Sequence, residues 1–180
     1  MIEVKNIFKS FADQEVLKDV SIVFEKGKTN LIIGQSGSGK TVLMKCCIGL
    51  LDVDRGEINF DKTCFSCMSE KEKRSIQKEM GVLFQGGALF DSFTVEDNVM
   101  FPLNMFTKMS LEEKRERVNT VLKRVNLVNA NMKFPAEISG GMVKRVAIAR
   151  AISLNPKYLF CDEPNSGLDP KTAELIDELI

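Results

Sequence analysis

Short stretches of alternating or clustered apolar residues predict β-strands in the first third of the chain and again near residues 80 and 160. Runs that are rich in β-branched and aromatic residues and bounded by turn residues are typical of strands. We expect strands over Ile2–Phe8, Val16–Phe24, Asn30–Ile33, Glu57–Phe60, Met80–Phe84 and Tyr158–Cys161. The compact apolar run at Tyr158–Cys161 is typical of a buried strand.

Between these stretches, apolar residues recur at the spacing of a helical turn. We expect helices over Thr41–Leu51, Ser69–Lys78, Thr94–Met105, Ser110–Asn126, Ser139–Leu154 and from Pro170 to Ile180. Pro102 predicts a break in the third of these helices, because proline lacks the N–H that a helix interior needs. Ser110 and Glu113 fit a capping box at the start of the fourth.

The order of these elements predicts an α/β fold. Strand–loop–helix succession indicates a core with a parallel sheet, here preceded by an N-terminal antiparallel β part. The mostly helical stretch of approximately residues 86–155 is expected to be a subdomain inserted into that core. We therefore expect residues 1–180 to form a single domain.

The composition fits a soluble globular chain of 180 residues, with 44% hydrophobic and 28% charged residues. Lys+Arg and Asp+Glu both number 25, so the net charge is zero. A balanced charge offers no global attraction to nucleic acid or to an anionic membrane. No apolar run approaches the roughly 20 residues that span a bilayer. If the protein works at a membrane, we expect another chain to supply the spanning helices.

Five cysteines are present, an odd number that favours reduced cytosolic thiols over a disulfide framework. Cys64 and Cys67 form a C-x-x-C pair. Such a pair alone is half of a tetrahedral zinc site, and the sequence has no histidine to complete it. Ordinary loop residues are therefore the favoured interpretation, with a metal or redox role as the alternative.

A glycine-rich loop lies between the expected strand Asn30–Ile33 and the expected helix Thr41–Leu51. The loop matches G-x-x-x-x-G-K-[ST] with the residues Gly34, Gln35, Ser36, Gly37, Ser38, Gly39, Lys40 and Thr41. Its glycines let backbone N–H groups curve around a phosphate, and the helix adds its N-terminal dipole. We expect Lys40 to reach the β- and γ-phosphates of ATP and Thr41 to offer its hydroxyl to Mg²⁺. A flexible glycine-serine turn is the less favoured alternative.

Two carboxylates follow the last expected strand, at Asp162 and Glu163. With a phosphate loop upstream, this pair predicts that Asp162 holds Mg²⁺ through water. Glu163 would then act on the attacking water as a general base or by orienting it. An acidic turn exposed to solvent is the alternative.

A second helix start is suited to an anion. Ser139 is a good N-cap, and Gly140 and Gly141 leave the first-turn N–H groups uncovered. Two such helix ends predict a nucleotide that is held from two sides, whereas a simply capped helix is the alternative.

Together these motifs resemble the nucleotide-binding domain of ABC transporters, in order and approximate spacing, over essentially the whole chain. The shared residues are the phosphate loop, Gln85, Ser139-Gly140-Gly141-Met142, Asp162-Glu163 and Ser166-Gly167-Leu168-Asp169. The resemblance implies a P-loop ATPase that uses ATP and Mg²⁺. It also implies a homodimer in which two copies sandwich the nucleotides. Each copy would contribute its signature segment, Ser139-Gly140-Gly141-Met142, to the phosphate loop of the other.

The resemblance also implies roles for single residues. Phe11 would stack on adenine, and Gln85 would sense Mg²⁺ and the attacking water. Ser139, Gly140 and Gly141 would face the γ-phosphate bound to the partner copy. Asp169 would link the two active sites through the D-loop.

The sequence departs from the family pattern in two places. Met142 stands where most members have glutamine, and the strand that ends in a switch histidine is missing. In related P-loop ATPases that strand lies in the sheet between the strand that precedes the phosphate loop and the strand that precedes the carboxylate pair. We therefore expect the 180 residues to be part of a longer protein, incomplete at the C-terminus, and to bind or hydrolyse ATP poorly on their own.

Within the family, residues 81–103 resemble the lipid-asymmetry (Mla-type) ATPases. Those ATPases also tend to have a methionine at the position of Met142. That resemblance implies phospholipid transport between bacterial membranes, with a permease and MCE-domain lipid-binding proteins as partners. The location would be cytoplasmic, peripheral on the inner membrane. Phe90, Phe93, Phe101 and Phe106 would line the permease groove, or alternatively belong to a subdomain core.

Other functions stay open. An importer of polar amino acids or methionine, which shares much of this layout, is the less favoured alternative to the lipid transporter. A chromosome-repair ABC protein is disfavoured, because no sustained heptads separate Lys40 from Ser139. A nucleotide-binding module without catalysis is the third alternative.

Overall fold

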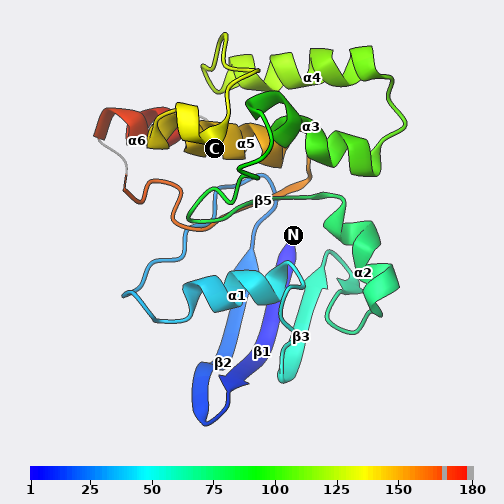
Figure 1. The fold of residues 1–180 in the computed structure, drawn as a ribbon. Coiled ribbons are helices and arrows are strands. Elements are labelled where there is room, and N and C mark those ends of the chain that lie inside the picture. The colour runs from blue at the N-terminus through cyan, green and yellow to red at the C-terminus, as the bar shows by residue number, and fades with distance from the viewer. Residues whose placement is uncertain (168–169, 178–180) are drawn as a thin grey trace. The chain divides into compact units, whose positions relative to one another are not determined.

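The computed structural model describes residues 1–167 and 170–177, which pack as two units, Met1–Gln77 and Lys78–Ile180. In the first unit the strands β1 (Ile2–Phe11), β2 (Gln14–Phe24), β3 (Arg55–Phe60) and β4 (Thr63–Cys64) form one antiparallel sheet. Their order is β2-β1-β3-β4, and Figure 1 labels the first three of them. The first three confirm expected strands, and the two-residue β4 is an addition.

A bulge in β1 lets both of its halves face the core. Val4 and Ile7 are buried although they are three positions apart, because the pairing register shifts between them. Asn6, within the shift, has a left-handed φ of 46°. The partner strand accommodates this with Gly56, where a Cβ would lie 2.3 Å from the Asn6 carbonyl oxygen.

The helices of the first unit are α1 (Lys40–Cys47) and α2 (Glu70–Gln77). The first ends before the expected Leu51, because Gly49 takes a left-handed φ of 75°. A Cβ at Gly49 would lie 2.8 Å from the ring of Phe65, so this close approach also requires glycine. Helix α1 contacts β2 and buries Leu43, Cys46 and Cys47.

The expected strand at Asn30–Ile33 is wrong, because the structure has no strand there. Leu31 is 80% exposed and Ile33 is 85% exposed. An extended apolar run becomes a strand only when a neighbouring backbone pairs with it. No strand within residues 1–167 or 170–177 does so for this run.

In the second unit β5 (Met80–Leu83) pairs in parallel with β6 (Tyr158–Cys161), which confirms the predicted parallel sheet. The pairing joins Met80 to Tyr158 and Leu83 to Cys161, so both strands end at one edge. The helices are α3 (Val95–Phe106), α4 (Leu111–Arg124), α5 (Gly140–Ile152) and α6 (Pro170–Asp177), with a short 3₁₀ turn at Pro135–Glu137. The α/β fold class is therefore confirmed, while an inserted subdomain at residues 86–155 stays a prediction.

The predicted break at Pro102 is wrong, because α3 continues through it. The flanking Val99 and Leu103 are almost completely buried, and their packing outweighs the hydrogen bond that proline cannot make. The predicted capping box is confirmed: Ser110 accepts from the Glu113 amide, and Glu113 accepts from the Ser110 amide. The following helix, α4, ends at Arg124, two residues short of the expected Asn126.

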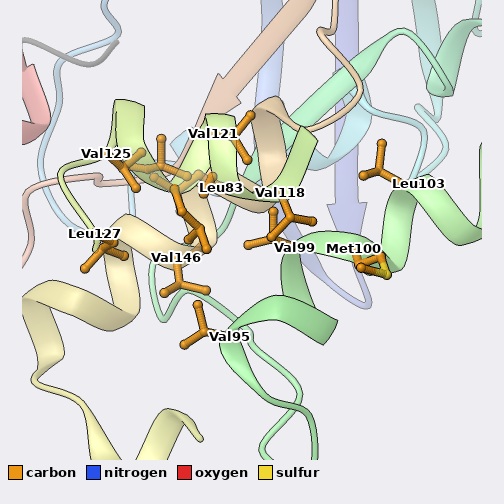
Figure 2. Close-up of a cluster of buried hydrophobic side chains, with 14 of the residues drawn as sticks. Leu83, Val95, Val99, Met100, Leu103, Val118, Val121, Val125, Leu127 and Val146 are labelled. Carbon is orange, nitrogen blue, oxygen red and sulfur yellow. The ribbon is translucent and has the colours of Figure 1, made fainter. Parts of the chain in front are cut away.

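Helix α5 is the centre of the second unit. It packs on α3, α4 and β5, and Val146, Ala147, Ile148 and Ala149 are all buried. Figure 2 shows the apolar side chains that gather there, including Leu83 from β5 and Val121 from α4. None of the helices within the described ranges has the length and apolarity to span a bilayer.

The contact between β5 and α5 leaves no room for a side chain at Gly81, where a Cβ would lie 2.4 Å from the Ala151 carbonyl oxygen. We expect Gly81→Val to lower the free energy of unfolding by about 1–3 kcal/mol through overpacking, measured by urea unfolding. Gly86→Ala is the matched control, since nothing lies within 4 Å of a Cβ there. Equal transition midpoints for the two variants would contradict the prediction.

Candidate functional site

The predicted phosphate loop leads directly into α1. Gly37 and Gly39 have left-handed φ values of 78° and 92°, which side chains rarely adopt. At Gly39 a Cβ would also lie 3.0 Å from the side chain of Leu17. Both backbone conformation and space therefore require glycine at this position.

Lys40 folds back over the loop that precedes it. Its ammonium Nζ donates to the carbonyl oxygens of Gly34 and Gln35, each at 2.8 Å. The Ser38 amide donates to the same Gln35 carbonyl at 3.2 Å. These bonds hold a positive charge over a loop whose residues 34–38 are exposed.

The start of α1 fits an anion. Its N-cap is Gly39, which has no side chain to cap the helix, and the first turn contains no acidic residue. The positive end of the helix dipole is therefore not compensated by the helix itself. With the ammonium of Lys40 beside it, this arrangement fits the phosphates of a nucleotide.

Two turns of the second unit bring Gln85 and Glu163 together. Gln85 follows β5 and Glu163 follows β6, so both lie at the edge where the parallel strands end. The Gln85 side-chain amide donates to Glu163 Oε2 at 2.7 Å. Glu163 has a left-handed φ of 48°, and both side chains are exposed. The bond joins residues 78 positions apart.

The neighbouring Asp162 is 8% exposed, and its amide donates to the Leu83 carbonyl at 2.9 Å, which extends the β5–β6 pairing. Burial raises the pKa of the preceding Cys161 thiol to about 11, so that thiol stays neutral at neutral pH. The buried Asp162 and the exposed Glu163 are thus adjacent in the chain but differ in their contact with solvent.

Sequence reasoning missed the role of Lys144 in this region. This lysine of α5 is 8% exposed, and its Nζ donates to the carbonyls of Glu163 and Pro164 at 3.4 and 3.1 Å. The Ser166 carbonyl also accepts from it. Burial lowers the pKa of Lys144, while the charge of Glu163 acts in the opposite direction. Lys144 thus ties the turn after β6 to α5.

Arg150 does the same for the turn after β5. Its guanidinium donates to the carbonyls of Gly87 and Ala88, each at 2.8 Å. Burial lowers the pKa of Arg150. Gly87 has a φ of 75°, and a Cβ there would lie 3.4 Å from Val143. Two cations on one helix therefore position the turns that carry Gln85 and Glu163. Nothing in the spacing of basic residues predicts these carbonyl partners.

The predicted second anion site lies at the start of α5. Ser139 is the N-cap, and its Oγ accepts from the Met142 amide at 3.3 Å. Ser139 and Gly140 are exposed, and nothing lies within 4 Å of a Cβ at Gly140. The first turn has no acidic residue. The helix start is therefore accessible to a partner, whereas Asp169 lies outside the described residues.

Phe11 and the phosphate loop belong to the first unit, and Gln85, Ser139, Asp162 and Glu163 to the second. Phe11 is 43% exposed at the end of β1, with the ammonium of Lys9 5.7 Å from its ring centre. Its exposed ring can stack on a planar group, and adenine stacking stays a prediction.

Three of the four expected permease-facing phenylalanines form one aromatic cluster. The Phe90 ring lies 5.1 Å from Phe93 and 4.8 Å from Phe101. The fully buried Asn98 holds their loop: it accepts from the Phe90 amide and donates to the carbonyls of Phe90, Phe93 and Thr94. Phe90 and Phe106 are 41% and 46% exposed, so they are surface residues and not core.

Comparison with known proteins finds a family model described as ABC transporter, which matches residues 17–166. The probable ribonucleotide transport ATP-binding protein mkl of Mycobacterium leprae is 45% identical over 99% of this chain and 52% of its own length. The methionine import ATP-binding protein MetN of Clostridium tetani is 40% identical over 100% of this chain and 56% of its own length.

The intermembrane phospholipid transport system ATP-binding protein MlaF of Haemophilus influenzae is 40% identical over 100% of this chain and 68% of its own length. The chain thus spans about half the length of the first two relatives. A solved structure, the dimeric post-hydrolysis state of the ATP-binding cassette MJ0796 bound to ADP and Pi, is 33% identical. It covers 99% of this chain and 81% of its own, with a TM-score of 0.92.

Lys144→Met should loosen the turn after β6, since three carbonyls lose a charged donor. Hydrogen bonds to charged groups contribute about 1.5–3 kcal/mol, so amide exchange in residues 163–167 should accelerate at least about tenfold. Hydrogen-exchange mass spectrometry measures this directly. Lys123→Met, at an exposed position of α4, is the control. Equal exchange of residues 163–167 in both variants would refute the role of Lys144.

Proposed function

Because the chain belongs to the ABC transporter family, we propose that it is the ATP-binding and ATP-hydrolysing part of a transporter subunit. The observation that carries the hydrolytic proposal is the 2.7 Å hydrogen bond between Gln85 and Glu163. It joins an exposed carboxylate to an amide at the edge where two parallel strands end, which is where α/β proteins bind ligands.

In this proposal each motif has one task. The nucleotide would be held by Phe11 at the adenine and by the loop Gly34–Thr41 at the phosphates. Thr41, Gln85 and Asp162 would provide oxygen ligands for Mg²⁺, either directly or through water. The metal, when bound, supplies positive charge that offsets the negative charge of the phosphates.

Glu163 is the proposed general base, because its exposed carboxylate is held in place by Gln85. Lys40 would contribute its positive charge at the phosphates, as a group that already lies over the loop. The backbone carbonyls beside Glu163 are fixed by Lys144, so this lysine is a positioning residue. Gln85 thus contacts the side chain of Glu163, and Lys144 contacts its backbone.

We propose that two copies form the working unit. The solved relative with ADP and Pi is dimeric, which supports this assembly. The start of α5 is accessible, and its first turn has no acidic residue. In the proposed dimer this helix start, formed by Ser139, Gly140 and Gly141, would face a phosphate bound by the other copy. Asp169 would link the two sites in the proposed dimer.

For the membrane partner we propose an integral permease that contacts exposed apolar side chains of the second unit, among them Phe90, Met105 and Phe106. Large apolar side chains that stay exposed are candidates for contact with another protein. The subunit would then be cytoplasmic and peripheral on the inner membrane.

The proposed cargo is phospholipid, moved between bacterial membranes with the help of an MCE-domain protein. The relative MlaF supports it, together with Met142 and the pattern of residues 81–103. Methionine import is the second candidate, favoured by the relative MetN at the same 40% identity. The first candidate rests on the detailed pattern, and the second on overall similarity.

Glu163→Gln in the full-length protein should lower ATP turnover by about 10²–10⁴-fold, because the base is lost, while ATP binding persists. Turnover and nucleotide affinity are measured separately, and ATP should shift the variant to a dimer in gel filtration. Lys40→Ala, in contrast, should lose ATP binding itself. Glu116→Gln, on the exposed face of α4, is the control. Normal turnover by Glu163→Gln would remove the proposed base.

Tagged full-length protein, purified in mild detergent, should bring down a permease together with phospholipid and an MCE-domain protein, identified by mass spectrometry. Phe106→Glu should lose all of these partners, since a charge enters an apolar contact. Phe134→Glu is the matched control, an equally exposed phenylalanine on another segment. Recovery of a methionine-binding partner in their place would overturn the phospholipid proposal.

A further inference from the structure

The C-x-x-C pair lies in a turn of the first unit, and the structure joins it as a Cys64–Cys67 disulfide. The expectation of reduced thiols is therefore wrong for this pair, while Cys46, Cys47 and Cys161 are free. Cys67 is exposed and Cys64 half-buried. Burial raises the pKa of the Cys46 and Cys47 thiols to about 11 and about 12, so neither competes as a reactive thiol. The accessible sulfur chemistry of this unit is concentrated in one turn.

A carboxylate faces the same turn. In the β3–β4 pairing Cys64 lies opposite Asn59, so Glu57, two residues before Asn59, lies on the face of the sheet that carries Cys64. The two sulfur atoms and a Glu57 carboxylate oxygen all lie within 4.8 Å of one another. Sequence spacing supplied only two ligands, and the strand pairing supplies a third.

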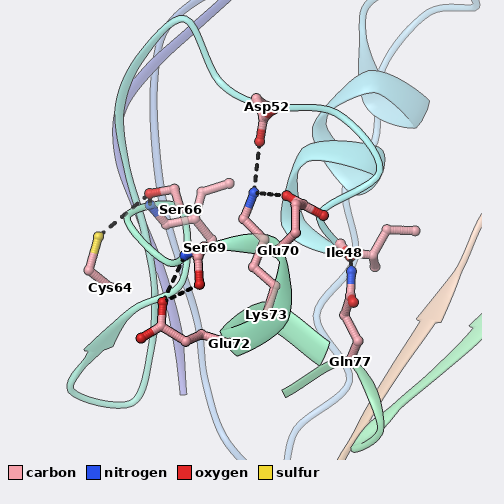
Figure 3. Close-up of polar contacts among 10 residues, drawn as sticks. Ile48, Asp52, Cys64, Ser66, Ser69, Glu70, Glu72, Lys73 and Gln77 are labelled. Carbon is pink, nitrogen blue, oxygen red and sulfur yellow. Dashed lines mark hydrogen bonds and ion pairs between the residues drawn. The ribbon is translucent and has the colours of Figure 1, made fainter. Parts of the chain in front are cut away.

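The backbone of this turn is held by contacts that do not involve the disulfide. The Phe65 side chain, between the cysteines, is 1% exposed and packs edge-on against Phe60 at 5.1 Å. The Ile58 amide donates to Ser66 Oγ at 2.9 Å, and the Phe65 amide donates to the Ile58 carbonyl at 2.8 Å. Figure 3 shows Ser66 beside the sulfur of Cys64, to which it lies at 3.6 Å. The two sulfurs would therefore stay close together after reduction.

We propose that the reduced turn is a binding site for a thiophilic divalent cation of the Zn²⁺ class, with Cys64, Cys67 and Glu57 as ligands. Two thiolates and a carboxylate are ligands that zinc prefers, and water would fill the fourth tetrahedral position. A disulfide has no thiolate to offer. The oxidised turn therefore lacks the site, and the thiol state controls access to it.

The chemistry balances with an external dithiol as reductant. The dithiol passes two electrons and two protons to the Cys64–Cys67 disulfide, the S–S bond breaks, and the reductant becomes a cyclic disulfide. Cation binding then displaces one proton from each of the two thiols into solvent. Binding is thus expected to release protons and to weaken as the pH falls.

The test is a zinc titration of the full-length protein in two thiol states. One sample is reduced with a dithiol that is removed under anaerobic conditions, and the other is kept as the disulfide. Competition with a coloured chelator, using Zn²⁺ alone, should show one tightly bound ion per reduced chain and none on the oxidised chain. With Co²⁺ alone, the reduced protein should show thiolate-to-metal charge-transfer absorption.

Variants identify the ligands. Cys64→Ser, Cys67→Ser and Glu57→Gln should each weaken Zn²⁺ binding at least about tenfold, since each removes a direct ligand. Cys47→Ala, a buried thiol, and Glu15→Gln, an exposed carboxylate of the same sheet, should bind as the wild type does. Circular dichroism verifies that every variant is folded.

Three results would overturn the proposal. The first is a reduced chain that binds no Zn²⁺, and the second is an oxidised chain that binds it equally well. The third is an unchanged affinity in the cysteine variants. An unchanged affinity in Glu57→Gln alone would overturn the three-ligand site. None of these outcomes depends on ATP, so they do not bear on the proposed ATPase.

Discussion

The close contact between β5 and α5 is the constraint on which the second unit depends. Gly81 has no side chain, and the Ala151 backbone therefore approaches the strand to a distance that any Cβ would prevent. From that position α5 reaches the turns that follow both strands, with Arg150 at one and Lys144 at the other. A packing contact thus fixes where Gln85 and Glu163 meet.

Backbone carbonyls, and not carboxylates, are the partners of these two cations. A buried lysine or arginine that pairs with a carboxylate occupies its oxygen atoms, whereas one that binds carbonyls leaves those oxygens open to other donors. Lys144 follows this second pattern, since the Glu163, Pro164 and Ser166 carbonyls accept from it. The Glu163 side chain is therefore left to accept from the amide of Gln85. A general base needs a carboxylate that reaches its target without being covered by a cation, and this arrangement leaves Glu163 uncovered by Lys144.

The sequence predicted most elements because their signals are local. Ser110 and Glu113 cap α4 through contacts three residues apart, and the run at Tyr158–Cys161 forms a strand within the expected bounds. Predictions failed where distant packing decides. Among the residues that the structure describes, no strand pairs with Asn30–Ile33, and α3 passes through Pro102 because its neighbours are buried.

The same distinction holds for the candidate site, where local motifs could be predicted from the sequence and long-range contacts could not. Glycine-rich loops and adjacent carboxylates are visible in the sequence because neighbouring residues compose them. The carbonyl contacts of Lys144 and Arg150 depend on how α5 packs, and the approach of Glu57 to Cys64 and Cys67 depends on strand register. None of these has a local signal. Asn98 is a further case, because only the fold shows that its amide closes the loop of Phe90 and Phe93.

Ligand chemistry would separate the two proposed metal sites of this chain. Thr41, Gln85 and Asp162 offer oxygen atoms, which suit the hard Mg²⁺ ion, while Cys64 and Cys67 offer sulfur, which suits Zn²⁺. Magnesium binds thiolates poorly, so cellular concentrations of Mg²⁺ would leave the sulfur site available. Of these two sites, only the sulfur site changes with thiol oxidation, because loss of two electrons and two protons joins Cys64 and Cys67 as a disulfide and leaves no thiolate. Helix α1, which begins at the phosphate loop, ends where Gly49 meets Phe65, the residue between those cysteines. Phe65 thus packs against the end of α1 as well as against Phe60, and both contacts help to hold the sulfur turn in place.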